Sequence, residues 1–106
     1  MKEQPNLTYI KSMSGGDELF ESKLIDIIKN EFPLEKAEYF SNFRKKDFKL
    51  TASNVHKLKH KISILGLEKS YAIAVDYENN LLEGSIDLAD DFESILSCIT
   101  NFLEDL

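Results

Sequence analysis

The sequence predicts an all-α fold, an antiparallel four-helix bundle with one or two short additional N-terminal helices. Apolar residues recur at helical three- and four-residue spacing almost throughout, and no stretch keeps the alternation typical of strands. Only four glycines and two prolines interrupt the chain, which favours helices joined by short turns. With 106 residues, 42% of them hydrophobic, residues 1–106 are expected to form a single domain with one core.

The N-terminal part predicts a short helix and then a longer one. The first covers residues 7–13, with Asn6 as a possible N-cap, and Ser14-Gly15-Gly16 ends it because paired glycines adopt left-handed geometry easily. Asp17 is expected to cap the second helix, which runs to about residue 30. Its predicted apolar stripe consists of Phe20, Leu24, Ile27 and Ile28.

Pro33 predicts the start of a third helix, because a proline at the first helical position loses no hydrogen bond. The cations that follow this segment suit a helix C-terminus. They are Arg44, Lys45 and Lys46, and the apolar residues of the segment are Leu34, Ala37, Phe40 and Phe43.

The next helix carries both histidines of the chain, His56 and His60. Thr51 or Ser53 is its predicted N-cap, and Gly66 is expected to break or loosen it. Spacings of three, four and three residues predict a buried seam, formed by Val55, Leu58, Ile62 and Leu65.

Two more helices are expected towards the C-terminus. One covers residues 68–83, ends at Gly84 and buries some of Tyr71, Ala74, Val75, Tyr77, Leu81 and Leu82. Ser85 or Asp87 is expected to open the last helix. Its apolar residues are Leu88, Phe92, Ile95, Ile99, Phe102 and Leu106. Cys98 falls within this pattern and is expected to be a small buried residue; a lone cysteine cannot form an internal disulfide, which fits a reducing cytoplasm.

Charge is distributed unevenly along the chain. The formal net charge is −6, yet one segment is strongly basic and invites an anionic partner. Its basic residues are Arg44, Lys45, Lys46, Lys49, Lys57, Lys59 and Lys61, with Asp47 as the one acid. The acidic remainder and the lack of a nucleic-acid-binding motif argue against nucleic acid. No apolar run approaches the ~20 residues that span a bilayer, so no membrane partner is expected.

His56 is predicted to be exposed. In helical projection it lies about 160° from Leu58, the centre of the buried seam. Its neighbours on the helix surface are Ala52, Ser53, Lys59, His60 and Ser63, most of them small. A histidine on such a face is accessible to a second protein, whereas a catalytic cleft would enclose it.

An exposed imidazole suits phosphoryl transfer. The ring is mostly neutral near neutral pH, so its nitrogen lone pair can attack an activated phosphoryl group without a separate base. Lys59, one turn further along, can place a positive charge beside the phosphate. Lys57 and Lys61, on another flank, are expected to contribute mainly to the local field.

His56-Lys57-Leu58-Lys59 followed by Gly66-Leu67 resembles the signature of histidine-containing phosphotransfer (HPt) domains. That pattern has an accepting His, Leu at +2, Lys at +3, usually Gly at +4, and Gly at +10 followed by an apolar residue. Further similar segments are Gly15-Gly16-Asp17 with Leu19-Phe20, Asp47-Phe48, and Tyr77-Glu78 in place of the usual Leu-Glu. Only His56 as acceptor matches; His60 would put Ser63 and Ser70 at +3 and +10.

The resemblance implies that His56 exchanges phosphate with aspartates of response-regulator receiver domains, in a phosphorelay fed by a hybrid sensor histidine kinase. It implies no kinase machinery in this chain, and no cofactor or metal, since the Mg²⁺ needed for transfer belongs to the receiver. The expected docking residues are Ala52, Ser53, His60, Ser63 and Gly66. His60 departs from the family, which usually has Gly there, and is expected to modify the choice of receiver.

Two other interpretations of the function remain compatible with the sequence. The chain can be a helical adaptor whose histidine is incidental. His56 and His60, four residues apart, can also chelate a metal ion, although no His-Glu-x-x-His arrangement accompanies them. The start at Met1 and the complete final helix favour a stand-alone module, for which a monomer is the simplest expectation. The polar N-terminus, which no signal-peptide core follows, fits a cytoplasmic location.

Overall fold

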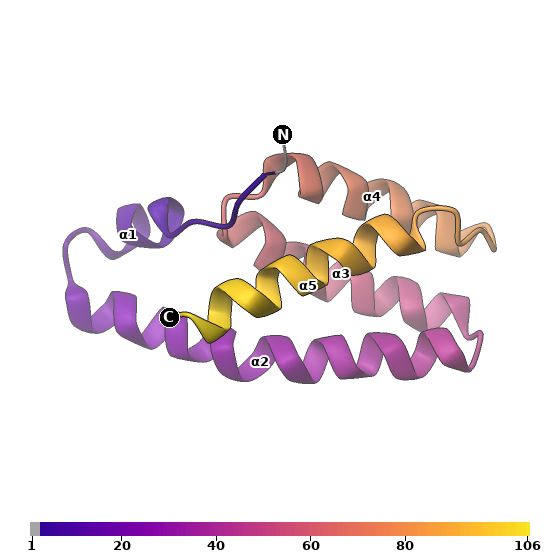
Figure 1. The fold of residues 1–106 in the computed structure, drawn as a ribbon, viewed down its shortest axis with the longest axis horizontal. Helices are drawn as coiled ribbons and strands as arrows, with labels where there is room; N and C mark the ends of the chain where they lie inside the picture. The colour runs from indigo at the N-terminus through magenta and orange to yellow at the C-terminus, as the bar shows by residue number, and fades with distance from the viewer. Residues whose placement is uncertain (1–2) are drawn as a thin grey trace.

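Residues 3–106 are described by a computed structural model, in which they form five helices and no strand (Figure 1). The helices are α1 (Thr8–Ser14), α2 (Glu18–Arg44), α3 (Phe48–Ile64), α4 (Glu68–Leu82) and α5 (Ala89–Glu104). The principal-axis extents are 44 × 28 × 20 Å. The all-α prediction is confirmed, and the helix packing is consistent with a bundle. No helix in this part of the chain combines the length and apolar character needed to cross a bilayer.

The helix α3 occupies the middle of the packing. It contacts α2 on one side and α4 on the other, while α5 packs on α4 and α2. Figure 1 shows α2 and α4 at opposite edges with α5 crossing in front, and α1 beside the start of α2. The largest fully buried side chains come from all five helices and the turn after α3: Tyr39, Tyr77, Phe32, Phe92, Ile10, Leu58, Ile62, Leu65, Leu67, Leu81, Leu96 and Ile99. The buried seam predicted for α3 is confirmed.

The predicted break at Pro33 is wrong, because α2 runs without interruption from Glu18 to Arg44 with Pro33 inside it. A proline in a helix interior removes one backbone hydrogen bond and usually costs about 3 kcal/mol. Here Pro33 is exposed, so water can solvate the carbonyl left without its amide partner. Phe32 and Tyr39, both buried, anchor the helix around the proline. Tertiary packing therefore overrides the local signal.

The apolar stripe predicted for α2 is also partly wrong. Three of its expected members, Phe20, Ile27 and Leu34, are 43%, 49% and 69% exposed, and Ala37 is exposed as well. The residues that α2 buries are Ile28, Phe32 and Tyr39, with Leu24, Ile25, Phe40 and Phe43 packed against them. In the C-terminal helices, Tyr71, Leu82 and Leu106 are exposed and Cys98 is half-buried.

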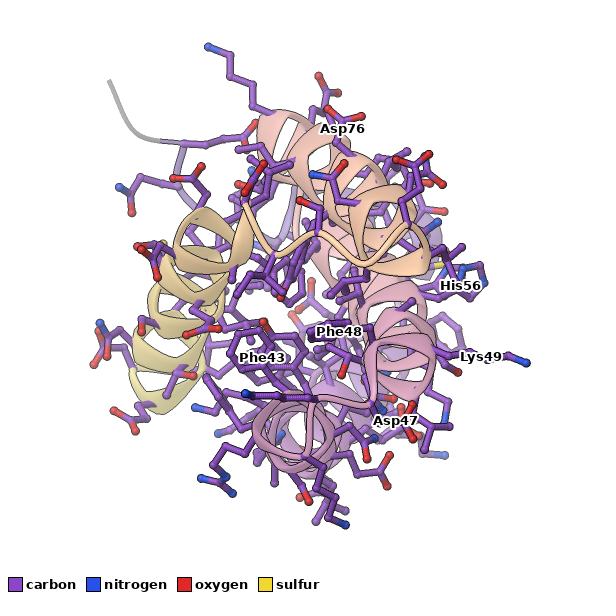
Figure 2. The ribbon with its side chains drawn as sticks, turned by 90° about the vertical axis from the view of Figure 1, so that its right-hand side faces the viewer. Phe43, Asp47, Phe48, Lys49, His56 and Asp76 are labelled. Atoms are coloured by element: carbon purple, nitrogen blue, oxygen red, sulfur yellow. The ribbon has the colours of Figure 1, made fainter. Side chains whose placement is uncertain are left out.

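The helix α3 begins earlier than predicted. Its N-cap is Asp47, whose carboxylate accepts a hydrogen bond from the Leu50 amide at 3.1 Å. The proposed caps Thr51 and Ser53 lie inside the helix, where the buried Thr51 hydroxyl donates to the Asp47 carbonyl. Figure 2 shows Phe48 turned towards the interior, beside Phe43. Phe48 is partly buried against the core, and this packing together with the Asp47 cap favours a first turn of α3 before Thr51 and Ser53.

The other boundaries lie close to the prediction. Asp17 caps α2 by accepting from the Leu19 and Phe20 amides. The N-cap of α1 is Leu7 rather than the predicted Asn6, although the Asn6 side chain, one residue earlier, accepts from the Thr8 amide. Glycines follow α1, α3 and α4 with positive φ, as expected of helix ends. The last helix starts at Ala89 rather than just after Ser85 or Asp87, and no side chain caps it.

Two tyrosine hydroxyls meet inside the bundle. The Tyr39 and Tyr77 oxygens are 2.6 Å apart, and Tyr39 also donates to the Glu93 carboxylate at 3.0 Å. Burial raises the pKa of Tyr77 to about 12 and that of Tyr39 further still. Both phenols therefore stay neutral at physiological pH, and this contact joins α2, α4 and α5.

Candidate functional site

The buried seam of α3 fixes the direction of His56. Val55 and Leu58 are fully buried on the inner side of the helix, so the position between them faces outwards. The His56 side chain is 55% exposed, and Figure 2 shows it at the surface. The predicted exposure of His56 is therefore confirmed.

A carboxylate from the neighbouring helix holds one edge of this imidazole. Glu78, on α4, places Oε2 3.2 Å from His56 Nδ1. A carboxylate at neutral pH can only accept a hydrogen bond, so Nδ1 carries the proton in this contact. In a neutral ring the other nitrogen, Nε2, then keeps its lone pair. Glu78 thus favours the tautomer in which Nδ1 carries the proton and Nε2 has the free lone pair.

The same carboxylate also binds Lys59. Its Nζ donates to Glu78 Oε1 at 3.0 Å and lies 5.9 Å from the centre of the Tyr71 ring. The Lys59 side chain is only 13% exposed, so it is more restrained than an ordinary surface lysine. His56, Lys59 and Glu78 therefore form one hydrogen-bonded group, with a cation one helical turn from the His56 ring.

The expected docking residues divide into exposed and covered positions. Ser53, His60 and Ser63 are exposed around His56. Ala52 is 2% exposed and belongs to the core, so the prediction that its side chain contributes to a docking surface is corrected. It precedes His56 by four residues, but its side chain lies on the packed side of the helix.

Gly66 has a role that its position in the signature did not reveal. Its φ of +77° is one that other residues rarely adopt, and a Cβ built there would lie 2.5 Å from Asn6 Nδ2. The backbone of Asn6 also donates to the Leu65 carbonyl at 2.8 Å. Gly66 therefore makes room for the N-terminal segment as well as ending α3.

The second histidine contacts the first. The rings of His56 and His60 lie edge to face, with centroids 5.1 Å apart. His60 is exposed on the next turn of α3. Any protein that approaches His56 from this side meets His60 too.

The lysines of α3 do not contribute equally to the local field. Lys61 donates to Glu31 at 2.9 Å and lies 3.3 Å from a Glu35 oxygen. Burial alone would lower the Lys61 pKa, but these two carboxylates outweigh it and raise the pKa. Lys61 is thus fully charged and locally neutralised, which weakens its predicted contribution. Lys49, in the first turn of α3, instead points outwards on the side of His56 (Figure 2).

Sequence reasoning missed Glu78 as a site residue, although it had matched Tyr77-Glu78 to the family pattern. Ala74, Tyr77 and Leu81 are the buried residues of α4, so Glu78 borders the packed stripe. A carboxylate at such a border is a candidate to reach across to the neighbouring helix. Which helix it meets depends on how α3 and α4 are paired.

Within residues 3–106, no group of three or more histidine, cysteine, aspartate or glutamate side chains is arranged to hold a metal ion. Comparison of the chain with protein-family models, with curated proteins and with solved structures gave no match.

Proposed function

We propose that this chain is a histidine-containing phosphotransfer protein of a multistep phosphorelay. His56 would accept a phosphoryl group from the aspartate of one receiver domain and pass it to another. The observation that carries the proposal is the state of His56. Its Nδ1 is held by Glu78, and its side chain is exposed on the outer face of α3.

The chemistry follows from that state. The Nε2 lone pair attacks the phosphorus of a receiver's aspartyl phosphate; the N–P bond forms as the P–O bond breaks, and the aspartate leaves as a carboxylate. The ring gains positive charge in this step, which the carboxylate of Glu78, hydrogen-bonded to Nδ1–H, offsets. Onward transfer reverses these bonds with a second receiver.

The basic side chains have distinct tasks in this proposal. Lys59 lies one turn from His56, and its ammonium can turn from Glu78 towards the phosphoryl oxygens once they arrive. Lys49, further along the same side, adds positive charge for an anionic aspartyl phosphate. The Mg²⁺ used in transfer would be the receiver's, and this chain would need no kinase machinery of its own.

The wider setting is part of the same proposal. The helices α2 to α5 would form the antiparallel four-helix bundle of the HPt family, with α1 as the short additional helix. Ser53, His60 and Ser63 would lie at the edge of the docked receiver. The source of the phosphate would be a hybrid sensor kinase in the cytoplasm, and the chain would act as a monomer.

The test is transfer of radiolabelled phosphate from a phosphorylated receiver. Wild-type protein is expected to gain a label that is labile in acid and stable in base. His56→Gln is expected to lose the label while keeping its helical circular dichroism, because the side chain is exposed. His60→Gln is the matched control on the same helix and should still be labelled.

Full labelling of His56→Gln would refute the assignment of the acceptor. Absence of label on the wild type, with every receiver of the source organism, would refute the proposed function. That second result would favour the alternative of a helical adaptor with an incidental histidine.

A further inference from the structure

The two histidines of α3 lie close enough together to bind one metal ion, a property that phosphotransfer does not require. His56 and His60 are both exposed, lie four residues apart on one helix, and have ring centroids separated by 5.1 Å. A metal ion bound to an imidazole nitrogen at about 2.1 Å lies roughly 3 Å from the ring centre. Two rings that share such an ion at a tetrahedral angle are about 5 Å apart. The backbone therefore already holds the two rings at a suitable distance, although their edge-to-face orientation does not yet aim both nitrogens at one point.

Glu78 prepares one of the two rings for this role. Histidines that bind metals usually donate their other N–H to a carboxylate, which fixes the tautomer and makes the free nitrogen a better ligand. His56 has that arrangement, because Glu78 accepts from Nδ1 at 3.2 Å. Its free nitrogen is therefore Nε2, the same atom that phosphoryl transfer would use.

The charges around the pair do not by themselves attract a cation, so the affinity must come from the two imidazoles. Carboxylates bind the Lys59 and Lys61 ammonium groups at 3.0 and 2.9 Å, whereas Lys49 and Lys57 are exposed on the same helix. The rings now meet edge to face, so one must rotate before both nitrogens converge. Exposed side chains can make such a rotation without repacking the core.

We propose that His56 and His60 together bind a divalent transition-metal ion, Cu²⁺ more tightly than Zn²⁺, and that the bound ion prevents phosphorylation of His56. The preference follows the general order of affinity of nitrogen ligands for these metals. Two imidazoles supply the protein ligands and water completes the coordination, since residues 3–106 offer no third ligand of the His, Cys, Asp or Glu type. The ion is consequently exchangeable and acts as an inhibitor. The inhibitory part rests on the proposed function, whereas the binding part does not.

Binding is tested by isothermal titration calorimetry, in which Cu²⁺ is added to the chain of residues 1–106 in a non-coordinating buffer. Wild type is expected to bind one ion at the pair. His60→Gly and His56→Gln should each weaken that binding about tenfold or more, because a single imidazole loses the gain in effective concentration from the second. Unchanged affinity in either variant would overturn the proposed pair.

Inhibition is tested by the label-transfer assay at saturating Cu²⁺. Each protein is compared with its own label in the absence of Cu²⁺, so that an effect of residue 60 on docking cancels. Wild type should lose its label on addition of Cu²⁺, and His60→Gly should keep its own metal-free level, since that variant retains His56 and lacks the chelating partner. Equal inhibition of both proteins would overturn the inhibitory part. Calorimetry needs no receiver, so a failure of the proposed function and a failure of metal binding give different results.

Discussion

Replacing Gly66 with alanine should destabilise the protein through two separable effects. The first is the backbone conformation, because a φ of +77° costs a residue with a Cβ roughly 1–2 kcal/mol. The second is the new methyl group, which would lie 2.5 Å from Asn6 Nδ2. Asn6 can swing away, but it then gives up the hydrogen bond from the Thr8 amide, a loss of about 1 kcal/mol. The expected total is about 2–3 kcal/mol.

Gly84 provides the matched control. Its φ is +85°, and nothing lies within 4 Å of a Cβ built there, so Gly84→Ala should show only the backbone cost of roughly 1–2 kcal/mol. Urea unfolding followed by circular dichroism measures both variants. The contribution of Asn6 is isolated by a double-mutant cycle, in which Gly66→Ala should cost about 1 kcal/mol less in an Asn6→Ala background.

Equal losses for Gly66→Ala and Gly84→Ala would refute the proposed fit between Asn6 and Gly66. Phosphotransfer adds an independent readout. If Gly66 acts through the fold, the folded fraction of Gly66→Ala should accept phosphate at the wild-type rate. A large rate loss in fully folded protein would instead place Gly66 at the receiver interface, as the signature pattern suggested.

Three further predictions concern the site and the N-terminal segment. Lys59→Ala should slow phosphotransfer without abolishing it, because the cation assists but does not react; an unchanged rate in single-turnover assays would make Lys59 a bystander. Glu78→Ala should slow transfer by about tenfold, since His56 loses a hydrogen bond worth about 1 kcal/mol or more, whereas Glu78→Gln keeps an acceptor but loses the negative charge and should recover only part of the rate. Equal rates for the two Glu78 variants would contradict a positioning role. Glu3 accepts from the Lys69 and Ser70 amides; burial alone would raise its pKa, but these hydrogen bonds outweigh burial and hold the pKa below 4.5. Its stabilisation is therefore present above pH 4.5 and lost as the pH falls through the lowered pKa. The difference in unfolding free energy between wild type and Glu3→Gln should shrink from pH 7 to pH 3, and a constant difference would contradict this linkage.

The sequence predicted those features of the fold that depend on local spacing. The seam through Val55 and Leu58 follows from helical periodicity, and it placed His56 on the outside, where it lies. The glycines that end helices were predicted equally well, because the backbone needs a positive φ at those positions. Such features need no knowledge of the neighbouring helix.

Features that depend on packing were not predictable in the same way. The local sequence around Pro33 predicts a helix start. However, α2 continues through Pro33, because Phe32 and Tyr39 on either side of it are buried in the core. Ala52 looked like part of a small exposed face, but it lies on the packed side. Glu78 could be matched to a pattern, but its contact with His56 spans 22 residues and requires α4 to lie beside α3 in one particular rotation.

That rotation is set from the other side of α4. Tyr77 precedes Glu78 and is held at its hydroxyl by Tyr39, 2.6 Å away in the interior. Successive residues of a helix are about 100° apart, so a roll of α4 that carried Glu78 away from His56 would also pull Tyr77 off its partner. The buried hydroxyl pair therefore restrains rotation of α4 about its own axis. The tautomer of His56, at the surface, thus depends in part on Tyr39 and Tyr77, which are fully buried.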